Sequence, residues 1–297
     1  MSRAADSAGQ PWQGRHFQPN SSSDDDGSAP AAYLSAVTAL RAGEQSLAEL
    51  VDVVRSCRFL IPLVAVAGEA GLTANGLVVD KTQELSIITV AGPDGRPLLP
   101  VFSSVDAMRR WRPDARPVPA DAVRVALAAA SEQTDRIVID PRSPESLLVL
   151  PRPAVWAIAQ GVPWVPAADD PEVLEAVARP VAQHPEIWAV SLVAGDPLAR
   201  GEAAEVIVRL AVEAGVTPER LRTVIELLSE HWAQDATILK RIDSLSVQPV
   251  ATARGEAPGS NVPATGATDA DATAADANAA DSTDADSTAA DATDALG

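Results

Sequence analysis

The residues best suited to recognition chemistry are five arginines grouped around one tryptophan. Residues 94–116 contain five arginines against three acidic residues, which predicts a locally positive surface. A planar guanidinium binds carboxylate or phosphate oxygens through parallel hydrogen bonds, and a neighbouring aromatic ring adds a stacking surface. The predicted binding residues are Arg96, Arg109, Arg110, Trp111, Arg112 and Arg116. The alternative is that these arginines form a solvated helix face and that the tryptophan belongs to the core.

Catalytic and metal chemistry has less support in the sequence. Cys57 is the single cysteine and lies between two arginines, whose charge would favour a reactive thiolate. A lone cysteine without a nearby histidine is more often a small buried packing residue. The three histidines, His16, His184 and His231, lack the spacing of a zinc site. We therefore expect no catalytic residue, no metal and no cofactor.

Two further patterns resemble ligand sites but are explained by local structure. Residues 71–76 have the glycine interval of a phosphate-binding loop, but Leu and Val follow where Lys and Ser or Thr are required. A turn between strands is expected there instead. Adjacent aspartates at 169 and 170 could ligate a hard cation, but the second precedes a proline, as a helix N-cap does.

Charge and hydrophobicity exclude several functional classes. The 297-residue chain has a formal net charge of -18, which disfavours non-specific nucleic-acid binding. Nine acidic residues against Arg254 alone follow residue 250, so the acidity is concentrated in the tail. The longest apolar run, residues 59–67, contains a proline and is too short to cross a bilayer. No secretion signal is evident at the start of the chain, so a cytoplasmic protein without a membrane segment is expected.

Local patterns predict short helices alternating with short strands. A capping box at Ser46 and Glu49 starts a helix, and the proline of the following strand places it at a sheet edge or a bulge. Asp94 and Gly95 indicate the turn of a β-hairpin. The remaining expected elements are a helix capped by Ser103, a helix from Pro119 to about Ala130, a strand over 136–140, a helical run ending at Gly161, and strands and a helix in the order ββαβ over 185–250.

These elements indicate an α+β fold with two small mixed sheets, helices packed on one face and disordered termini. The tail repeats small units of Ala, Thr and Asp and contains almost no large apolar residue, so it cannot offset the cost of ordering. The predicted regions are a disordered lead (1–43), a first domain (44–165), a hinge or linker helix (166–184), a second domain (185–250) and a disordered acidic tail (251–297).

Five segments of the first domain, taken in order, resemble the SseB N-terminal domain. They are Leu60-Ile-Pro-Leu-Val, Asp94-Gly-Arg, Leu99-Pro-Val-Phe-Ser-Ser, Trp111-Arg-Pro with Arg116-Pro-Val-Pro, and Ile137-Val-Ile-Asp-Pro. The ββαβ segment is similar to the family's C-terminal domain. Ser103 in place of a threonine, and residues 140–144 in place of a glycine-bearing turn, depart from the pattern. The resemblance implies a fold and a cytosolic setting but no catalytic residue or cofactor.

The expected function is therefore non-enzymatic binding or regulation, with loops 94–116 and 140–146 facing an unidentified protein partner. The alternative is a hydrolase or transferase whose site is assembled from distant residues such as Cys57 or Asp140. A third possibility is that the acidic tail itself competes for a basic surface.

Overall fold

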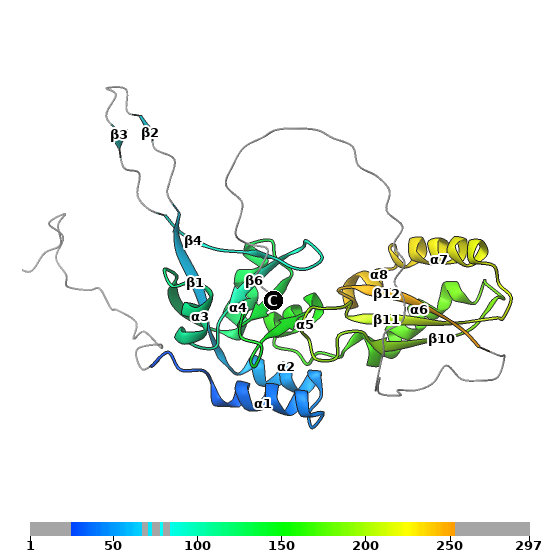
Figure 1. The fold of residues 1–297 in the computed structure, drawn as a ribbon, viewed down its shortest axis with the longest axis horizontal. Coiled ribbons are helices and arrows are strands. Elements are labelled where there is room, and N and C mark those ends of the chain that lie inside the picture. Colours follow the sequence, from blue (N-terminus) through cyan, green and yellow to red (C-terminus); the bar gives the residue numbers. More distant parts are fainter. Residues whose placement is uncertain (1–24, 67–70, 73–77, 80–83, 253–297) are drawn as a thin grey trace, which may run out of the picture.

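The computed structural model describes residues 25–66, 71–72, 78–79 and 84–252 (Figure 1). The first domain contains α1 (Ala31–Ala42), α2 (Leu47–Arg55), β1 (Arg58–Val66), β2 (Gly71–Leu72), β3 (Val78–Val79), β4 (Glu84–Ile87), β5 (Val90–Ala91), β6 (Pro97–Val101), α3 (Val105–Trp111), β7 (Arg116–Asp121), α4 (Ala122–Ser131), β8 (Arg136–Ile139), β9 (Leu148–Leu150) and α5 (Arg152–Gln160). The second domain contains the 3-10 turn η1 (Ala167–Asp169), α6 (Pro171–Val181), β10 (Ile187–Ala194), β11 (Val206–Val212), α7 (Pro218–Trp232), α8 (Ala236–Arg241) and β12 (Leu245–Ala251). The predicted α+β class is confirmed.

The centre of the first domain is a mixed sheet with the order β5-β6-β8-β9, in which β6 and β8 are parallel. Alternate strand residues point to opposite faces, so each face has its own set of apolar side chains. One face packs against α1, α2, α4 and α5 through Leu99, Val101, Ile137, Ile139, Leu148 and Leu150. The other face is apolar at Leu98, Val138 and Val149 and is covered by Trp111 from α3.

A second sheet of the first domain has the order β4-β1-β7, so β1 is its central strand. Of the two predicted settings for Pro62, a sheet edge or a bulge, the edge is therefore wrong, and β1 pairs with β7 through Pro62 without a register shift. Pro62 lies between Leu60, which exchanges backbone hydrogen bonds with Phe102, and Leu63, where pairing with β4 begins. The missing proline amide thus falls where β1 changes partners on that side.

The predicted disordered lead is wrong for residues 31–43, which form α1 and its Gly43 cap. Tyr33, Ala36, Val37 and Leu40 follow helical spacing and are buried in the core of the first domain. Helical spacing brings these four side chains onto one stripe, whose burial offsets the ordering cost. Residues 1–24 and 253–297, which include most of the predicted disordered regions, lie outside the described residues.

The second domain is a sheet with the order β10-β11-β12 and helices on one face (Figure 1). Alternate residues of β11 pack against α6 and α7. The helix predicted at 166–184 is present as α6, but it is not a hinge or linker, because its Val173 and Val177 are fully buried in this core. The predicted ββαβ order is present with α8 added before β12, and the sheet continues to Ala251.

Several helix ends match the local predictions, and two do not. The Ser46–Glu49 capping box, the Asp170 and Thr217 caps and the left-handed Gly161 cap are present. Ser104, not Ser103, caps α3. Pro119 lies in β7, and Asp121 caps α4 instead, because its carboxylate accepts from the Arg124 amide. The hairpin at Gly95 is confirmed, and its two strands are β5 and β6.

None of the helices in the described part of the chain is both long and apolar enough to span a bilayer. Most of the glycine-spaced segment 71–76, namely 73–76, lies outside the described residues, and Gly71 and Leu72 pair with β3.

Candidate functional site

Helix α3 presents most of the predicted arginines and is fixed to the domain by apolar residues. The Ser104 hydroxyl accepts from the Ala107 amide at 3.1 Å and starts the helix. Met108 is buried, and Trp111 is half-buried with its ring 5.2 Å from that of Phe102. Trp111 therefore holds α3 on the sheet with only part of its surface exposed.

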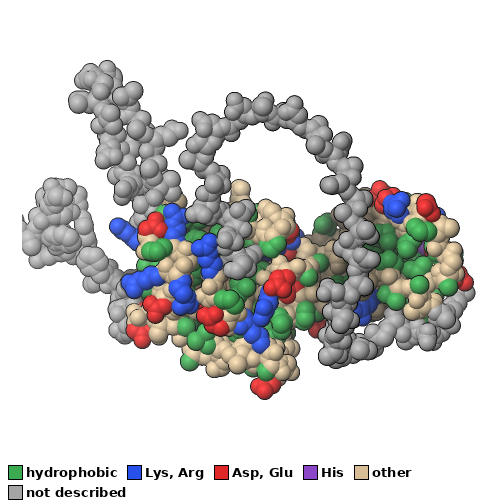
Figure 2. All heavy atoms as spheres, in the orientation of Figure 1, with side chains coloured by type: hydrophobic (Ala, Val, Ile, Leu, Met, Phe, Trp, Pro, Cys, Tyr) green, Lys and Arg blue, Asp and Glu red, His purple; other side chains and the backbone are tan. Residues whose placement is uncertain are grey.

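The arginines of α3 and of the strand after it lie on the surface. Figure 2 shows basic side chains gathered where α3 lies in Figure 1. Arg110 and Arg112 have side chains that are 54% and 43% exposed. Arg110 contacts the Ser143 hydroxyl and the Glu145 carboxylate, and Arg112 contacts Asp114. Arg109 and Arg116 are exposed, and their side chains make no hydrogen bond or ion pair with the described residues. We call Arg109, Arg110, Arg112 and Arg116 the arginine face.

A buried hydroxyl–carboxylate pair fixes the two loops beneath the arginine face. Ser103 follows β6 and Asp140 follows β8, so parallel pairing brings both residues to the same sheet edge. The Asp140 carboxylate accepts from the Ser103 amide at 2.7 Å and from its hydroxyl at 2.5 Å. Burial raises the pKa of Asp140, although the bonds from Ser103 oppose that rise. Asp140 is completely buried and Ser103 is 2% exposed, so this pair joins the loops and does not face a substrate.

The loop 140–146 is attached to two other elements. Arg110 of the arginine face donates to the Ser143 hydroxyl at 3.0 Å. Tyr33 of α1 donates to the Ser146 carbonyl at 2.5 Å in the core. Asp140 adopts a left-handed backbone conformation with φ of 53°. The loop is thus attached to α3 through Arg110 and to α1 through Tyr33.

Arg96 differs from the other predicted arginines because its charge is already matched. Its guanidinium donates to Asp94 at 2.8 Å and, across the domain boundary, to Asp243 at 3.0 Å. Arg136, which is 91% buried at its side chain, contacts the same two acids at 2.7 and 3.8 Å. Arg96 therefore belongs to a domain-interface network and is not part of the arginine face.

The domain-interface network contains three arginines and three carboxylates. Its members are Arg96, Arg136, Arg152, Asp94, Glu205 and Asp243. Arg152 donates from the first domain to the Leu239 carbonyl at 2.6 Å and also to that of Ile242. The network is not visible in the sequence, because its members come from both domains and no local spacing links them.

Electrostatics differ sharply within the network. Burial raises the pKa of Asp94, but hydrogen bonds from Arg136 and Arg96 outweigh it and hold that pKa below its usual range. Burial raises the pKa of Glu205 to about 7, and repulsion from Asp243 adds to the rise, whereas backbone hydrogen bonds from Asp243 and Ser244 and the charge of Arg152 oppose it. Glu205 is thus the one interface carboxylate whose charge is poorly stabilised among those the structure describes.

The other candidate residues lie apart from the arginine face. Cys57 is buried, and burial raises the pKa of its thiol, as expected of a packing residue. His184 and His231 belong to the second domain, and neither is hydrogen-bonded to Cys57 or Asp140. Asp170 caps α6 and pairs with Arg241 at 2.6 Å. The described residues contain no cluster of three or more His, Cys, Asp or Glu side chains suited to a metal ion.

Comparison with known families identifies the first domain. Residues 34–157 match the model of the SseB protein N-terminal domain, which confirms the predicted resemblance. The match begins within α1 and ends within α5, so α1 belongs to this domain. No curated protein and no solved structure matches the chain.

Proposed function

Because residues 34–157 form an SseB N-terminal domain, we propose that this SseB-like protein is a non-enzymatic binding module whose arginine face recognises an acidic segment of a protein partner. The observation that carries the proposal is the pair of exposed, unpartnered arginines, Arg109 and Arg116, beside two others with unused donors. Arg96 is not included because its guanidinium already pairs with Asp94 and Asp243.

The chemistry favours carboxylates as the recognised groups. Each guanidinium has five N–H donors in a planar fork that fits a carboxylate through two bonds. Arg110 uses one of its terminal nitrogens, and Arg112 uses its Nε, within the domain. The remaining donors face solvent at little desolvation cost, so an acidic ligand gains several charge-assisted hydrogen bonds at once.

Rigidity of the surface supports the same proposal. Binding orders fewer groups when the recognition surface is already fixed, so less of the interaction energy is lost. The Ser103–Asp140 pair, the Arg110–Ser143 bond and the packing of Trp111 on Phe102 fix the loops and the helix. The partner would therefore meet a preformed surface.

The proposal is tested with a fluorescent peptide of alternating Asp and Ala residues, titrated with the full chain and followed by anisotropy. Arg109→Glu with Arg116→Glu should weaken binding at least about ten-fold, which is roughly 1.4 kcal/mol. The matched control is Arg222→Glu with Lys240→Glu, which makes the same charge change on exposed residues of the second domain. An equal loss in both variants would mean that only net charge matters, and would contradict the proposal.

The acidic tail provides a second arm of the same experiment. Its nine acidic residues are chemically similar to the proposed ligand and would compete with the peptide. A chain ending at residue 252 should bind the peptide more tightly than the full chain, mainly at low salt, where the screening length is about 30 Å at 0.01 M. Tail removal without any effect at either salt concentration would exclude such competition.

A further inference from the structure

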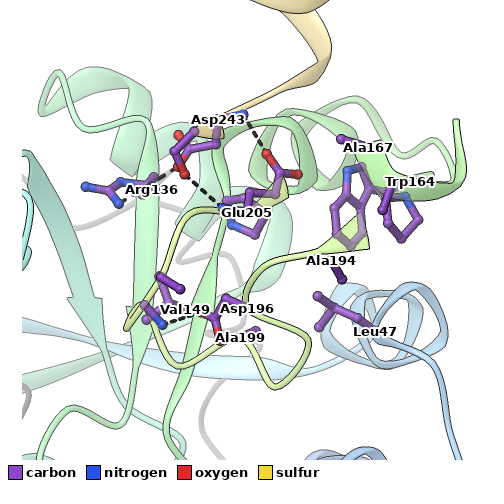
Figure 3. Close-up of a pocket in the computed structure, with 16 residues that line it drawn as sticks. Leu47, Arg136, Val149, Trp164, Ala167, Ala194, Asp196, Ala199, Glu205 and Asp243 are labelled. Atoms are coloured by element: carbon purple, nitrogen blue, oxygen red, sulfur yellow. Dashed lines mark hydrogen bonds and ion pairs between the residues drawn. The ribbon is translucent and has the colours of Figure 1, made fainter. Parts of the chain in front are cut away.

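Two buried polar atoms without a hydrogen-bond partner belong to residues that line one cavity between the two domains, away from the arginine face. The cavity has a volume of about 60 Å³, enough for several waters or a molecule of a few non-hydrogen atoms. Leu47 and Val149 of the first domain and Ala167 and Ala194 of the second form its apolar wall (Figure 3). Trp164, between the domains, and Glu205 provide polar atoms in the same cavity.

Two of these polar atoms have no hydrogen-bond partner. Trp164 is only 7% exposed, and its indole Nε1–H donates to no described atom. Oε1 of Glu205 is shielded from solvent and accepts no hydrogen bond, whereas Oε2 accepts from the Asp243 amide at 2.6 Å. A buried polar group without a hydrogen bond is unfavourable, because it has lost its bonds to water. One unused donor and one unused acceptor in a single cavity indicate a ligand that offers both complements.

The pairing of the charged side chains around the cavity indicates which group of a ligand would contact Glu205. Arg96 and Arg136 form ion pairs with Asp94 and Asp243, and backbone amides donate hydrogen bonds to the Asp196 carboxylate. The charge of Arg152 lowers the pKa of Glu205, but the hydrogen bonds of its guanidinium go to the backbone carbonyls of Leu239 and Ile242. Glu205 forms no ion pair with the described residues. A cationic group on the ligand would supply that missing partner.

We propose that this cavity binds a small molecule with a protonated primary amine and a hydroxyl group. The ammonium donates to Oε1 of Glu205, and the hydroxyl oxygen accepts from Nε1 of Trp164. This proposal concerns a separate site and does not depend on the arginine face. The cavity adjoins a wider groove of about 810 Å³, which shares Leu47, Pro166, Ala168 and Ala194 with it and provides a route of entry.

The test uses ethanolamine as the probe and the isotopically labelled full chain. The indole N–H resonances of the six tryptophans are followed by proton–nitrogen correlation spectra, and Trp164→Phe assigns the relevant one. We expect a saturable shift of the Trp164 resonance alone. Ethylamine, which lacks the acceptor, and ethylene glycol, which lacks the cation, should each bind at least about ten-fold more weakly.

Variants and pH provide independent readouts. Glu205→Gln should weaken ethanolamine binding at least about ten-fold, whereas Glu202→Gln, an exposed control on the same loop, should not. In the wild-type chain, binding should be about ten-fold tighter at pH 8 than at pH 6, because more of Glu205 is ionised while the amine stays protonated. This pH comparison decides the matter even if Glu205→Gln does not fold. No saturable shift, or equal binding of ethylene glycol, would overturn the proposal and leave only water in the cavity.

Discussion

Arginines have different surroundings on the arginine face and in the domain-interface network. On the arginine face they are exposed, and Arg109 and Arg116 have no partner among the described residues. In the network, Arg136 is buried and contacts two acids, one from each domain. An exposed arginine contributes little to stability and keeps its donors for a partner, whereas a buried one is costly to remove. The position of the counter-charges therefore separates a binding role from a structural one.

The largest expected effect is a loss of stability when an arginine of the domain-interface network is removed. Arg136→Ala should lower the free energy of unfolding by about 3 kcal/mol, because Asp94 and the buried Asp243 lose a partner. Urea unfolding measures the change. Arg124→Ala is the control, since Arg124 is 73% exposed and should change stability by less than about 0.5 kcal/mol. A similar small loss in both variants would show that the network contributes no more than a surface pair.

Removing the Ser103–Asp140 pair beneath the arginine face should have the next largest effect on stability. Asp140→Ala removes the acceptor of both the Ser103 amide and its hydroxyl, and should cost about 2 kcal/mol. Asp106→Ala is the control, because Asp106 is an exposed residue of α3. Thermal unfolding gives the stability, and peptide anisotropy should show weaker binding because loop 140–146 is less fixed. Unchanged stability would mean that the pair does not hold these loops.

Glu205 makes the stability of the interface depend on pH. Its folded-state pKa of about 7 lies above the ordinary value of 4.5, so its contribution is present in acid and is lost as pH rises through 7. Unfolding free energy should therefore fall by about 2 kcal/mol from pH 5 to pH 8 through this group. Glu205→Gln should reduce that slope and leave the contributions of the other titrating groups. An identical pH profile in the variant would contradict the assignment.

Local signals in the sequence were sufficient for several helix ends. The Ser46 capping box and the Asp170 cap were readable because their partners lie two or three residues away. Helix α1 could also have been predicted, since Tyr33, Ala36, Val37 and Leu40 have helical spacing. The segment before it is rich in serine and aspartate, and this composition favoured a prediction of disorder. The parts that depend on local chemistry were therefore the predictable ones.

The long-range features could not be read in the same way. Ser103 and Asp140 are 37 residues apart, and only the parallel pairing of β6 with β8 makes them neighbours. Arg96 and Asp243 are 147 residues apart and meet only when the domains dock. The five arginines near one tryptophan were visible in the sequence, but the sequence did not reveal that Arg96 pairs with Asp94 and Asp243. Tertiary contacts decided which arginines remain available.

The most direct test combines affinity and stability in one variant, Arg109→Glu with Arg116→Glu. Peptide anisotropy and urea unfolding are measured on the same preparation. The predicted result is at least about a ten-fold loss of peptide binding with a change in unfolding free energy below about 0.5 kcal/mol. Unchanged binding, or a loss of binding accompanied by unfolding, would contradict the claim that these arginines serve recognition and not the fold.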